Sequence, residues 1–456
     1  MSRKPTDHES DAFRIAGLSR RDFLRRSALA STALLATGCA STTHRRGAAR
    51  PGSPEEETRA PAIVGRAVQP LRVGVIGCGG RGTGAAIDCV KSSEQVSIVA
   101  LGDLFADRVA SSRAQLEKSE LGEALQVTDE RCFSGFENYK GVLSCDVDLV
   151  ILAAPPGFRP PHLKAAIAAG KHVFMEKPVA VDPVGVRSII ASSDLAREKG
   201  LAIVAGTQRR HDPAYVETIR RIHDGHIGRI VAAQCYWNQG ELWVHERKSE
   251  YSDMEWQCRN WLYFDWLSGD HIVEQHIHNL DVINWAIGSP PVRCVGMGGR
   301  QVRTGPEYGN IYDHFSVEYE YPDGVRVLSM CRQIKGSSDR VAERLVGTKG
   351  VSDPNGRIEG PRHYLYEPAG EAVNPYEQEH RHLVESIRRG RPLNEGRRVA
   401  ESTLTAIMGR MSAYTGREIS WDWIMNASKL DLSPAAYAFG DLPVRAVPTP
   451  GVTELV

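Results

Sequence analysis

Three glycines near residue 80 have the spacing of a dinucleotide-binding turn. Gly77, Gly79 and Gly82 follow residues 72–76, an apolar run rich enough in Val and Ile to form a buried parallel strand. In such a turn the first glycine permits the tight bend, the second lets backbone approach a pyrophosphate, and the third lets the next helix pack closely. This spacing therefore predicts a site for a nucleotide cofactor.

The residues around the turn indicate which nucleotide would bind. A helix that begins near Gly80 and Arg81 would turn its free N–H groups and positive dipole end toward phosphates. A second apolar strand, 96–101, is followed by Asp103, which stands 21 residues after Gly82. A carboxylate at that place accepts hydrogen bonds from the adenosine ribose and repels a 2′-phosphate. The sequence therefore predicts NAD as the cofactor, rather than NADP.

A lysine stands at the end of another predicted strand. Residues 172–175 form a short apolar run that leads directly into Glu176, Lys177 and Pro178. Ligands of a parallel sheet lie beyond the carboxyl ends of its strands, so this topology brings Lys177 to the cofactor crevice. Hydride transfer from an alcohol carbon needs a proton acceptor and a positive charge beside the developing alkoxide. The ammonium of Lys177 can supply that charge.

His278 is the candidate acid–base group, because imidazole titrates closest to neutral pH. In a helix, Glu274, His278 and Asp281 would share one face. Asp281 could orient His278 or simply solvate the helix, and His278 itself could be an ordinary core histidine. His271 and His276 lie nearby, but their spacing does not bring imidazoles to one face as zinc sites require, so no metal site is predicted.

A third set of polar and aromatic side chains has the profile of a sugar site. Arg259, Asn260 and Trp261 combine planar hydrogen-bond donors with an aromatic platform. Aromatic residues at such spacing also serve as core, and both interpretations stay open at this point.

These candidates need two kinds of supporting domain. Strands and helices alternate over residues 70–206, which predicts a doubly wound α/β domain. Alternating runs with turn pairs then predict a mostly antiparallel sheet within residues 207–432. Helices expected at 375–388 and 395–414 would fold back on the nucleotide domain, and the Pro-rich tail 433–456 carries no readable pattern.

Taken together, these motifs resemble the glucose–fructose oxidoreductase, inositol dehydrogenase and rhizopine catabolism (Gfo/Idh/MocA) family. The similarity covers roughly residues 70–430 and depends on the glycine turn, on Glu176–Lys177–Pro178 and on residues 274–281. It implies an α/β fold in which a Rossmann domain precedes an α/β domain with an open-faced, mostly antiparallel sheet. It also implies an NAD(P)-dependent oxidoreductase acting on a secondary hydroxyl of a sugar or polyol. The family usually has Asp at the position of Glu274 and Gly at that of His276.

The motifs and the resemblance together define the expected site. Lys177, His278 and Glu274 are the expected catalytic residues. Cofactor contacts are expected at Gly77, Gly79, Gly80, Arg81, Gly82, Asp103, Pro155, His162, Glu176, Lys177 and Gln208. Substrate contacts are expected at Arg210, Arg259, Asn260, Trp261 and Asp281. A second subunit normally covers an open-faced sheet, so we expect a homodimer or homotetramer.

The first 40 residues resemble an export signal. Residues 19–24 resemble a twin-arginine motif, residues 28–38 are modestly apolar, and the box ending at Cys39 resembles a lipoprotein cleavage site. Residues 41–69 have the composition of a flexible linker. We therefore expect a protein exported by the twin-arginine route, periplasmic or lipid-anchored at Cys39. That route carries folded proteins, so the NAD is expected to leave with the chain, stay tightly bound and be recycled in place.

Composition restricts the remaining function classes. Lys plus Arg and Asp plus Glu both number 56, so the net charge is zero and nucleic acid is a poor partner. No run of about 18 apolar residues marks a membrane span, and nine cysteines without a C-x-x-C pair predict no zinc or disulfide framework. Two alternatives stay open: an NAD-dependent glycoside hydrolase that oxidises its substrate transiently and uses Glu274 or His276 as an extra base, and a non-catalytic sugar-binding relative.

Overall fold

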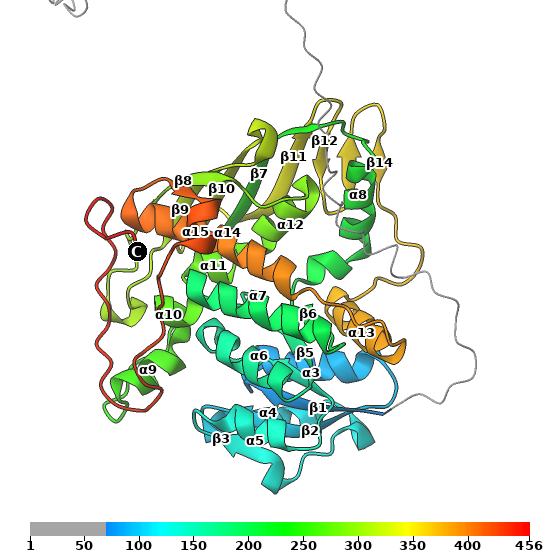
Figure 1. Ribbon diagram of the computed structural model, residues 1–456, viewed down its shortest axis with the longest axis vertical. Coiled ribbons are helices and arrows are strands. Elements are labelled where there is room, and N and C mark those ends of the chain that lie inside the picture. The colour runs from blue at the N-terminus through cyan, green and yellow to red at the C-terminus, as the bar shows by residue number, and fades with distance from the viewer. Residues whose placement is uncertain (1–69) are drawn as a thin grey trace, which may run out of the picture. The chain divides into compact units, whose positions relative to one another are not determined.

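The computed structural model describes residues 70–456, which belong to one compact unit of the chain (Figure 1). The predicted twin-arginine segment, Cys39 and the linker 41–69 lie outside the described residues. Within the part described, no helix is both long and apolar enough to cross a membrane. The eight cysteines in the same part are all free thiols.

The first sheet has six parallel strands in the order β3-β2-β1-β4-β5-β6. Its strands are β1 (Leu71–Ile76), β2 (Val96–Asp103), β3 (Cys132–Ser134), β4 (Leu149–Leu152), β5 (His172–Met175) and β6 (Ile203–Ala205). This is the strand order of doubly wound dinucleotide-binding domains, and the order reverses between β1 and β4. A crevice is therefore expected beyond the carboxyl ends of these two strands.

Helices cover both faces of this sheet, as continuous apolar strands require. They are α3 (Gly80–Ser92), α4 (Ala106–Lys118), α5 (Asn138–Ser144), α6 (Arg159–Ala168) and α7 (Pro183–Glu198). Two later helices, α13 (Pro375–Arg388) and α14 (Gly396–Thr415), return to this domain. α13 packs on α3, while α14 lies between α7 and the second sheet (Figure 1). Nearly all of α14 is buried, so it joins the two halves of the molecule.

The second sheet has nine strands in the order β14-β13-β12-β11-β7-β10-β9-β8-β15. They are β7 (Ile230–Gln239), β8 (Arg293–Gly299), β9 (His314–Glu320), β10 (Arg326–Gln333), β11 (Arg340–Gly347), β12 (Val351–Asp353), β13 (Arg357–Glu359), β14 (Tyr364–Leu365) and β15 (Ile419–Ser420). All neighbouring strands are antiparallel except β7 and β10, which are parallel. The predicted fold class, a Rossmann domain plus an α/β domain with a mostly antiparallel sheet, is confirmed.

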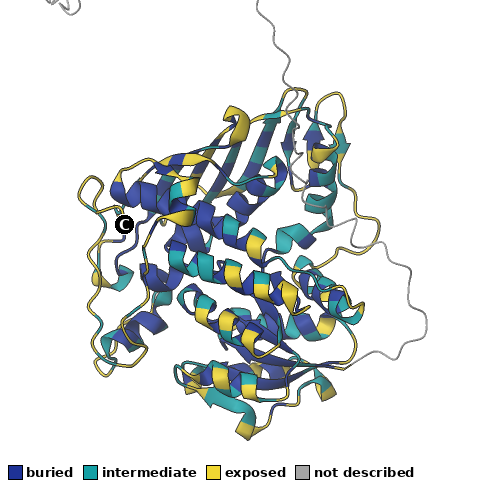
Figure 2. Ribbon diagram, viewed as in Figure 1, coloured by how far each residue is buried: buried dark blue, intermediate teal, exposed yellow. Residues whose placement is uncertain are grey.

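One face of the second sheet packs on helices. The remaining helices are α8 (Pro213–His223), α9 (Asp253–Arg259), α10 (Asp265–Ser268), α11 (His271–Glu274), α12 (Ile277–Ile287) and α15 (Trp421–Asn426). Phe315, Val317 and Tyr319 alternate along β9 and are buried on the covered side. Figure 2 shows the dark blue interior where these helices meet the sheet. On the opposite face, β8 and β10 expose apolar side chains, among them Met297 and Leu328.

The segment around His278 differs from the predicted single helix. α11 ends at Glu274 and α12 begins at Ile277, so Glu274 and His278 lie on separate helices. Asp270 initiates α11 with a φ of 70°, and its carboxylate accepts a hydrogen bond from the His271 N–H at 2.6 Å. Helical periodicity therefore does not relate the two side chains; the break between α11 and α12 decides their relative position.

Candidate active site

The turn between β1 and α3 contains two glycines, Gly77 and Gly82, at which any side chain would collide with neighbouring backbone. Gly77 has a φ of 100°, and a Cβ there would lie 2.2 Å from the Ala154 N. A Cβ on Gly82 would lie 1.8 Å from the carbonyl oxygen of Gly77. At Gly79 and Gly80, by contrast, an added Cβ would meet only open space. The backbone is thus held tightly on one side and is open on the other, as a pyrophosphate cradle must be.

That open side belongs to a cavity of about 470 Å³ beyond the carboxyl ends of the first sheet. Eight of the residues expected to contact the cofactor line it: Gly77, Gly79, Gly80, Arg81, Gly82, Asp103, Pro155 and His162. Three aromatic residues that sequence analysis did not single out, Phe105, Phe136 and Phe158, complete much of its wall. A volume of this size, with a glycine turn on one side and apolar walls, suits a nucleotide.

Asp103 is positioned by the turn itself. One carboxylate oxygen accepts a hydrogen bond from the Cys78 N–H at 2.7 Å, and the other accepts one from the Phe105 N–H at 2.9 Å. Burial raises the pKa of Asp103, and these two N–H groups offset part of that effect. Each carboxylate oxygen keeps a lone pair, so the group can still accept bonds from ribose hydroxyls.

Lys177 extends from the end of β5 to the other half of the molecule. Its Nζ donates to the Glu274 carbonyl oxygen at 2.6 Å and to the Glu274 Oε1 at 3.1 Å. The side chains of Lys177 and Glu274 are only 11% and 9% exposed, so this is a nearly buried ion pair. Glu274 Oε2 is also buried and has no hydrogen-bond partner. Arg81 bonds the neighbouring Glu176, which links this end of the site to the glycine turn.

His278 lies in the first turn of α12, with its ring stacked on Trp237 at a centroid distance of 5.5 Å and an angle of 21°. Burial lowers the pKa of His278 well below its usual range, and the positive charge of Lys177 lowers it further. Its Nδ1 is buried without a hydrogen-bond partner. The imidazole is therefore neutral at physiological pH and able to accept a proton, close to an ammonium group.

Two family models match this chain on either side of the site. Residues 71–207 match the model described as "Oxidoreductase family, NAD-binding Rossmann fold", and residues 215–352 match the GFO/IDH/MocA C-terminal domain. The chain belongs to the Gfo/Idh/MocA oxidoreductase family. Residues 71–207 therefore form an NAD-binding Rossmann domain, and the predicted family membership is confirmed.

Relatives within this family have different activities. An inositol 2-dehydrogenase of Saccharopolyspora erythraea is 30% identical over 165 residues, 36% of this chain and 44% of that protein. A glycosyl hydrolase family 109 protein of Shewanella amazonensis is 25% identical over 256 residues, 54% of this chain and 50% of that protein. The chain thus spans about half the length of these relatives. The structure of an aldose–aldose oxidoreductase from Caulobacter crescentus shares the fold, with a TM-score of 0.61 and 20% identity over 77% of this chain and 100% of that one.

The Asp281 carboxylate bonds other residues than His278, so it does not orient that imidazole. Its carboxylate bonds the Arg210 guanidinium at 2.7 and 3.0 Å and accepts from the Ser402 hydroxyl at 2.7 Å. Arg210 and Asp281 form a nearly buried ion pair, with 11% and 2% exposed side chains, that joins the turn at residues 208–211 to α12, while the Ser402 hydroxyl joins α14 to the same carboxylate. Both were expected to touch substrate; the structure pairs them with each other, and the substrate contact stays a prediction. Gln208, an expected cofactor contact, donates to the Tyr376 hydroxyl at 3.1 Å.

His276 is directed into the second sheet. Its Nε2 bonds the Ser329 hydroxyl at 2.7 Å, and burial lowers its pKa to about 3. Its imidazole is fully buried and bonded within the core, and its expected role as an extra base stays a prediction. Among residues 70–456, no group of three or more His, Cys, Asp and Glu side chains could hold a metal ion.

Two of the three expected sugar-binding residues, Arg259 and Trp261, line the cavity. The Arg259 guanidinium carbon is 3.9 Å from the Phe105 ring centroid, and its Nη1 lies 3.2 Å from an Asp107 carboxylate oxygen. Asn260 is fully buried and uses its amide to bond the Glu307 carbonyl at 2.7 Å and the His245 N–H at 2.9 Å. Arg259 and Asn260 thus brace the loops that carry Phe105, His245 and Glu307, and their role in sugar binding stays a prediction.

Sequence analysis missed a carboxylate that belongs to the site. Glu379, on α13, is fully buried and its Oε1 lies 3.3 Å from the Arg81 Nη2, so Arg81 bridges Glu176 and Glu379. Burial, followed by the neighbouring Glu176, raises the pKa of Glu379 well above its usual range. The sequence feature that could have identified Glu379 is the helical periodicity of α13, which places this residue on the face that packs against α3.

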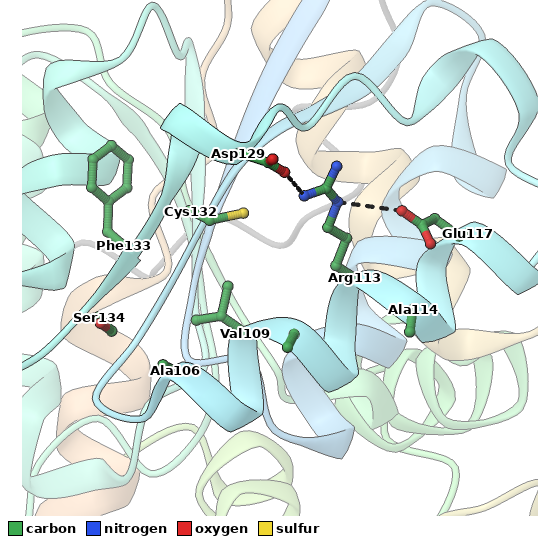
Figure 3. Close-up of a pocket in the computed structure, with 10 residues that line it drawn as sticks. Ala106, Val109, Arg113, Ala114, Glu117, Asp129, Cys132, Phe133 and Ser134 are labelled. Carbon is green, nitrogen blue, oxygen red and sulfur yellow. Dashed lines mark hydrogen bonds and ion pairs between the residues drawn. The ribbon is translucent and has the colours of Figure 1, made fainter.

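A second cavity, of about 420 Å³, lies on the outer side of the Rossmann domain between α4 and β3 (Figure 3). Its charged groups pair with one another: Arg113 lies 3.3 Å from Glu117 and also bonds Asp129. The pairing leaves no charge directed at a ligand, and we assign no function to this cavity.

Proposed function

We propose that this protein transfers hydride between NAD and a secondary hydroxyl of a sugar or polyol. Two observations carry this proposal: the glycine turn opens on a cavity at the carboxyl edge of the first sheet, and the Lys177 ammonium, held by Glu274 at the end of β5, acts electrostatically on the buried His278 imidazole. The similarity to an inositol 2-dehydrogenase supports a polyhydroxylated substrate. The Trp237 ring beside His278 offers a flat apolar surface of the kind that packs against sugar C–H groups.

The residues present fit NAD. The glycine turn has the open backbone that a pyrophosphate needs, and Asp103 keeps lone pairs for ribose hydroxyls. Asp103 also favours NAD over NADP, because a carboxylate repels a 2′-phosphate. When bound, the nicotinamide ring would supply the hydride acceptor or donor.

Side chains of this protein would accept the proton that the substrate hydroxyl loses. Two buried polar atoms, Glu274 Oε2 and His278 Nδ1, lack partners near the Lys177 ammonium. Orphaned buried atoms in a native site indicate a place where a ligand completes the hydrogen bonds. Lys177 can donate to the substrate oxygen and stabilise the alkoxide, while neutral His278 accepts the proton. Glu274 holds the ammonium in place.

Replacing Lys177 tests this assignment directly. We expect Lys177→Met to lower turnover at least about 100-fold, because the alkoxide loses its charge partner. NAD binding, measured by calorimetry, should change little, since the glycine turn and Asp103 are untouched. Lys164→Met, on the exposed side of α6, is the matched control and should leave both unchanged. Substantial turnover in Lys177→Met on inositols and aldoses that the native protein oxidises would overturn the assignment.

A redox-neutral hydrolase is the second candidate, favoured by the similarity to a glycosyl hydrolase family 109 protein. It needs one further base near the sugar, and Glu274, with its unpartnered Oε2, is the group available. Chromophore release from nitrophenyl glycosides without added NAD would support this function. The absence of release, together with NADH formation from a free polyol, would support the dehydrogenase.

We also propose that the chain is exported with its cofactor bound, which the twin-arginine-like residues 19–24 support. In cell fractionation the native chain should reach the envelope, whereas Arg20→Lys/Arg21→Lys should stay in the cytoplasm. A native chain found only in the cytoplasm would contradict this.

A further inference from the structure

The C-terminal segment, in which the sequence showed no pattern, runs back along the side of the molecule that carries α9 and α10 (red in Figure 1). It contains no helix or strand, yet it is attached to α9 by three hydrogen bonds. The Gly440 carbonyl accepts from the Met254 N–H at 3.1 Å, and the Leu442 carbonyl accepts from the Gln257 Nε2 at 2.6 Å. The Leu442 N–H donates to Asp253 at 3.2 Å.

From this attachment, two aromatic side chains contact the walls of the cofactor cavity. The Phe439 ring lies 5.0 Å from Phe136 and 6.1 Å from Phe105, centroid to centroid. The Tyr437 ring lies 5.5 Å from Phe158. All three partners line the cavity.

The three partners stand on different loops of the Rossmann domain. Phe105 follows β2, Phe136 follows β3 and Phe158 follows β4. Phe136 and Phe158 also contact each other directly, with ring centroids 6.4 Å apart. Tyr437 and Phe439 join all three loops, and α9, to which the segment is attached, also contributes Arg259 to the cavity above Phe105.

We propose that residues 437–442 form a clasp that closes the nucleotide end of the cavity and sets the rate at which NAD leaves. This inference rests on the proposed function. Phe105 stands two residues after Asp103, so the clasp lies at the adenosine side, away from Lys177. Phe439 is 49% exposed and Tyr437 37% exposed, so both rings can detach without unfolding the core. Opening of the clasp, rather than domain separation, then controls cofactor exchange.

The experiment measures NADH release from the full chain. Trp243 and Trp261 line the cavity, so energy transfer from tryptophan to bound NADH reports its occupancy. After mixing with excess NAD, we expect NADH to leave Tyr437→Ser/Phe439→Ser roughly tenfold faster than the native chain, since several aromatic pairs are lost. Tyr437→Phe/Phe439→Tyr keeps both rings and should release NADH at the native rate. Val452→Ser, at a 76% exposed position of the same segment, is the surface control and should also match it.

The outcomes separate the clasp from the proposed function. Equal release rates in the native chain and in Tyr437→Ser/Phe439→Ser, both loaded with NADH, overturn the clasp alone. A native chain that takes up no NADH overturns the proposed function, and the clasp with it. If the double variant melts at a much lower temperature than the native chain, Phe439→Ser alone carries the test, with an expected increase of about threefold. An unchanged rate in that single variant overturns the clasp.

Discussion

Burial, and then the charge of Lys177, keep the pKa of His278 well below its usual range. Glu274 balances the Lys177 ammonium, and the remaining positive field acts on His278, two residues beyond the end of the helix break. Burial and this field both favour the neutral imidazole. A neutral base beside a fixed cation suits alcohol oxidation, in which the proton must leave while negative charge develops on oxygen.

This arrangement predicts the pH dependence of oxidation. The pKa of His278 lies below its usual value of about 6.5, so the base is already neutral above that pH. We therefore expect kcat/KM to be flat from about pH 6.5 upward, and to fall only at lower pH as His278 becomes protonated. A rate that still rises between pH 7 and 8 would contradict this. In His278→Asn the acid limb should disappear and the rate should drop about 100-fold.

At the scale of elements, the site depends on how closely α3 approaches β1. The approach is fixed by Gly82, because its α-carbon faces the Gly77 carbonyl. Gly84 lies on the same helix two residues later, and a Cβ there would meet only the Arg81 Nη1, at 3.7 Å. Gly84 is therefore a matched control for Gly82: a side chain at Gly82 would collide with backbone, whereas one at Gly84 has room.

Alanine substitution at Gly82 and at Gly84 should have opposite effects on stability. Gly82→Ala forces α3 away from the turn, so we expect a loss of about 1–3 kcal/mol in unfolding free energy, and NAD binding at least tenfold weaker. Gly84→Ala should leave NAD affinity unchanged and stabilise α3 by up to about 1 kcal/mol. Urea unfolding and NAD titration measure both quantities. Equal effects of the two changes would show that the turn is not tightly packed.

For the whole molecule, the notable surface is the uncovered face of the second sheet, where apolar side chains are exposed in a single chain. Met297 on β8 and Met330 on β10 both pair with Ser316 on β9, so the two side chains flank it on one face. They are 72% and 37% exposed. Contiguous exposed apolar side chains on a sheet indicate a surface that another molecule covers.

We therefore predict a homodimer or homotetramer that associates through this face. Met297→Glu/Met330→Glu should shift the protein to monomers in sedimentation velocity, because four or more charges would be buried without partners in each interface. Val452→Glu, exposed on the C-terminal segment, should leave the assembly unchanged. A native chain that sediments as a monomer at micromolar concentration would refute the prediction.

Local sequence determined the parts of the site that depend on neighbours along the chain. The glycine spacing defines its own turn, and Lys177 stands at the carboxyl edge of the first sheet because a parallel strand ends just before it. Both are short-range effects: a turn needs particular backbone angles, and strand direction fixes where the following residue lies. The two-domain α/β fold followed from the same kind of pattern, because strand and helix periodicities are local.

Tertiary structure decided which side chains pair. Lys177 and Glu274 are 97 residues apart, and local spacing allowed Asp281 either to orient His278 or to solvate its helix. It binds Arg210, because α12 packs where η4 (Gln208–His211) brings that guanidinium next to it. The aromatic contacts of Tyr437 are equally invisible in the sequence. Such pairings depend on how whole elements pack, and that packing is set by burial summed over the entire core rather than by any one segment.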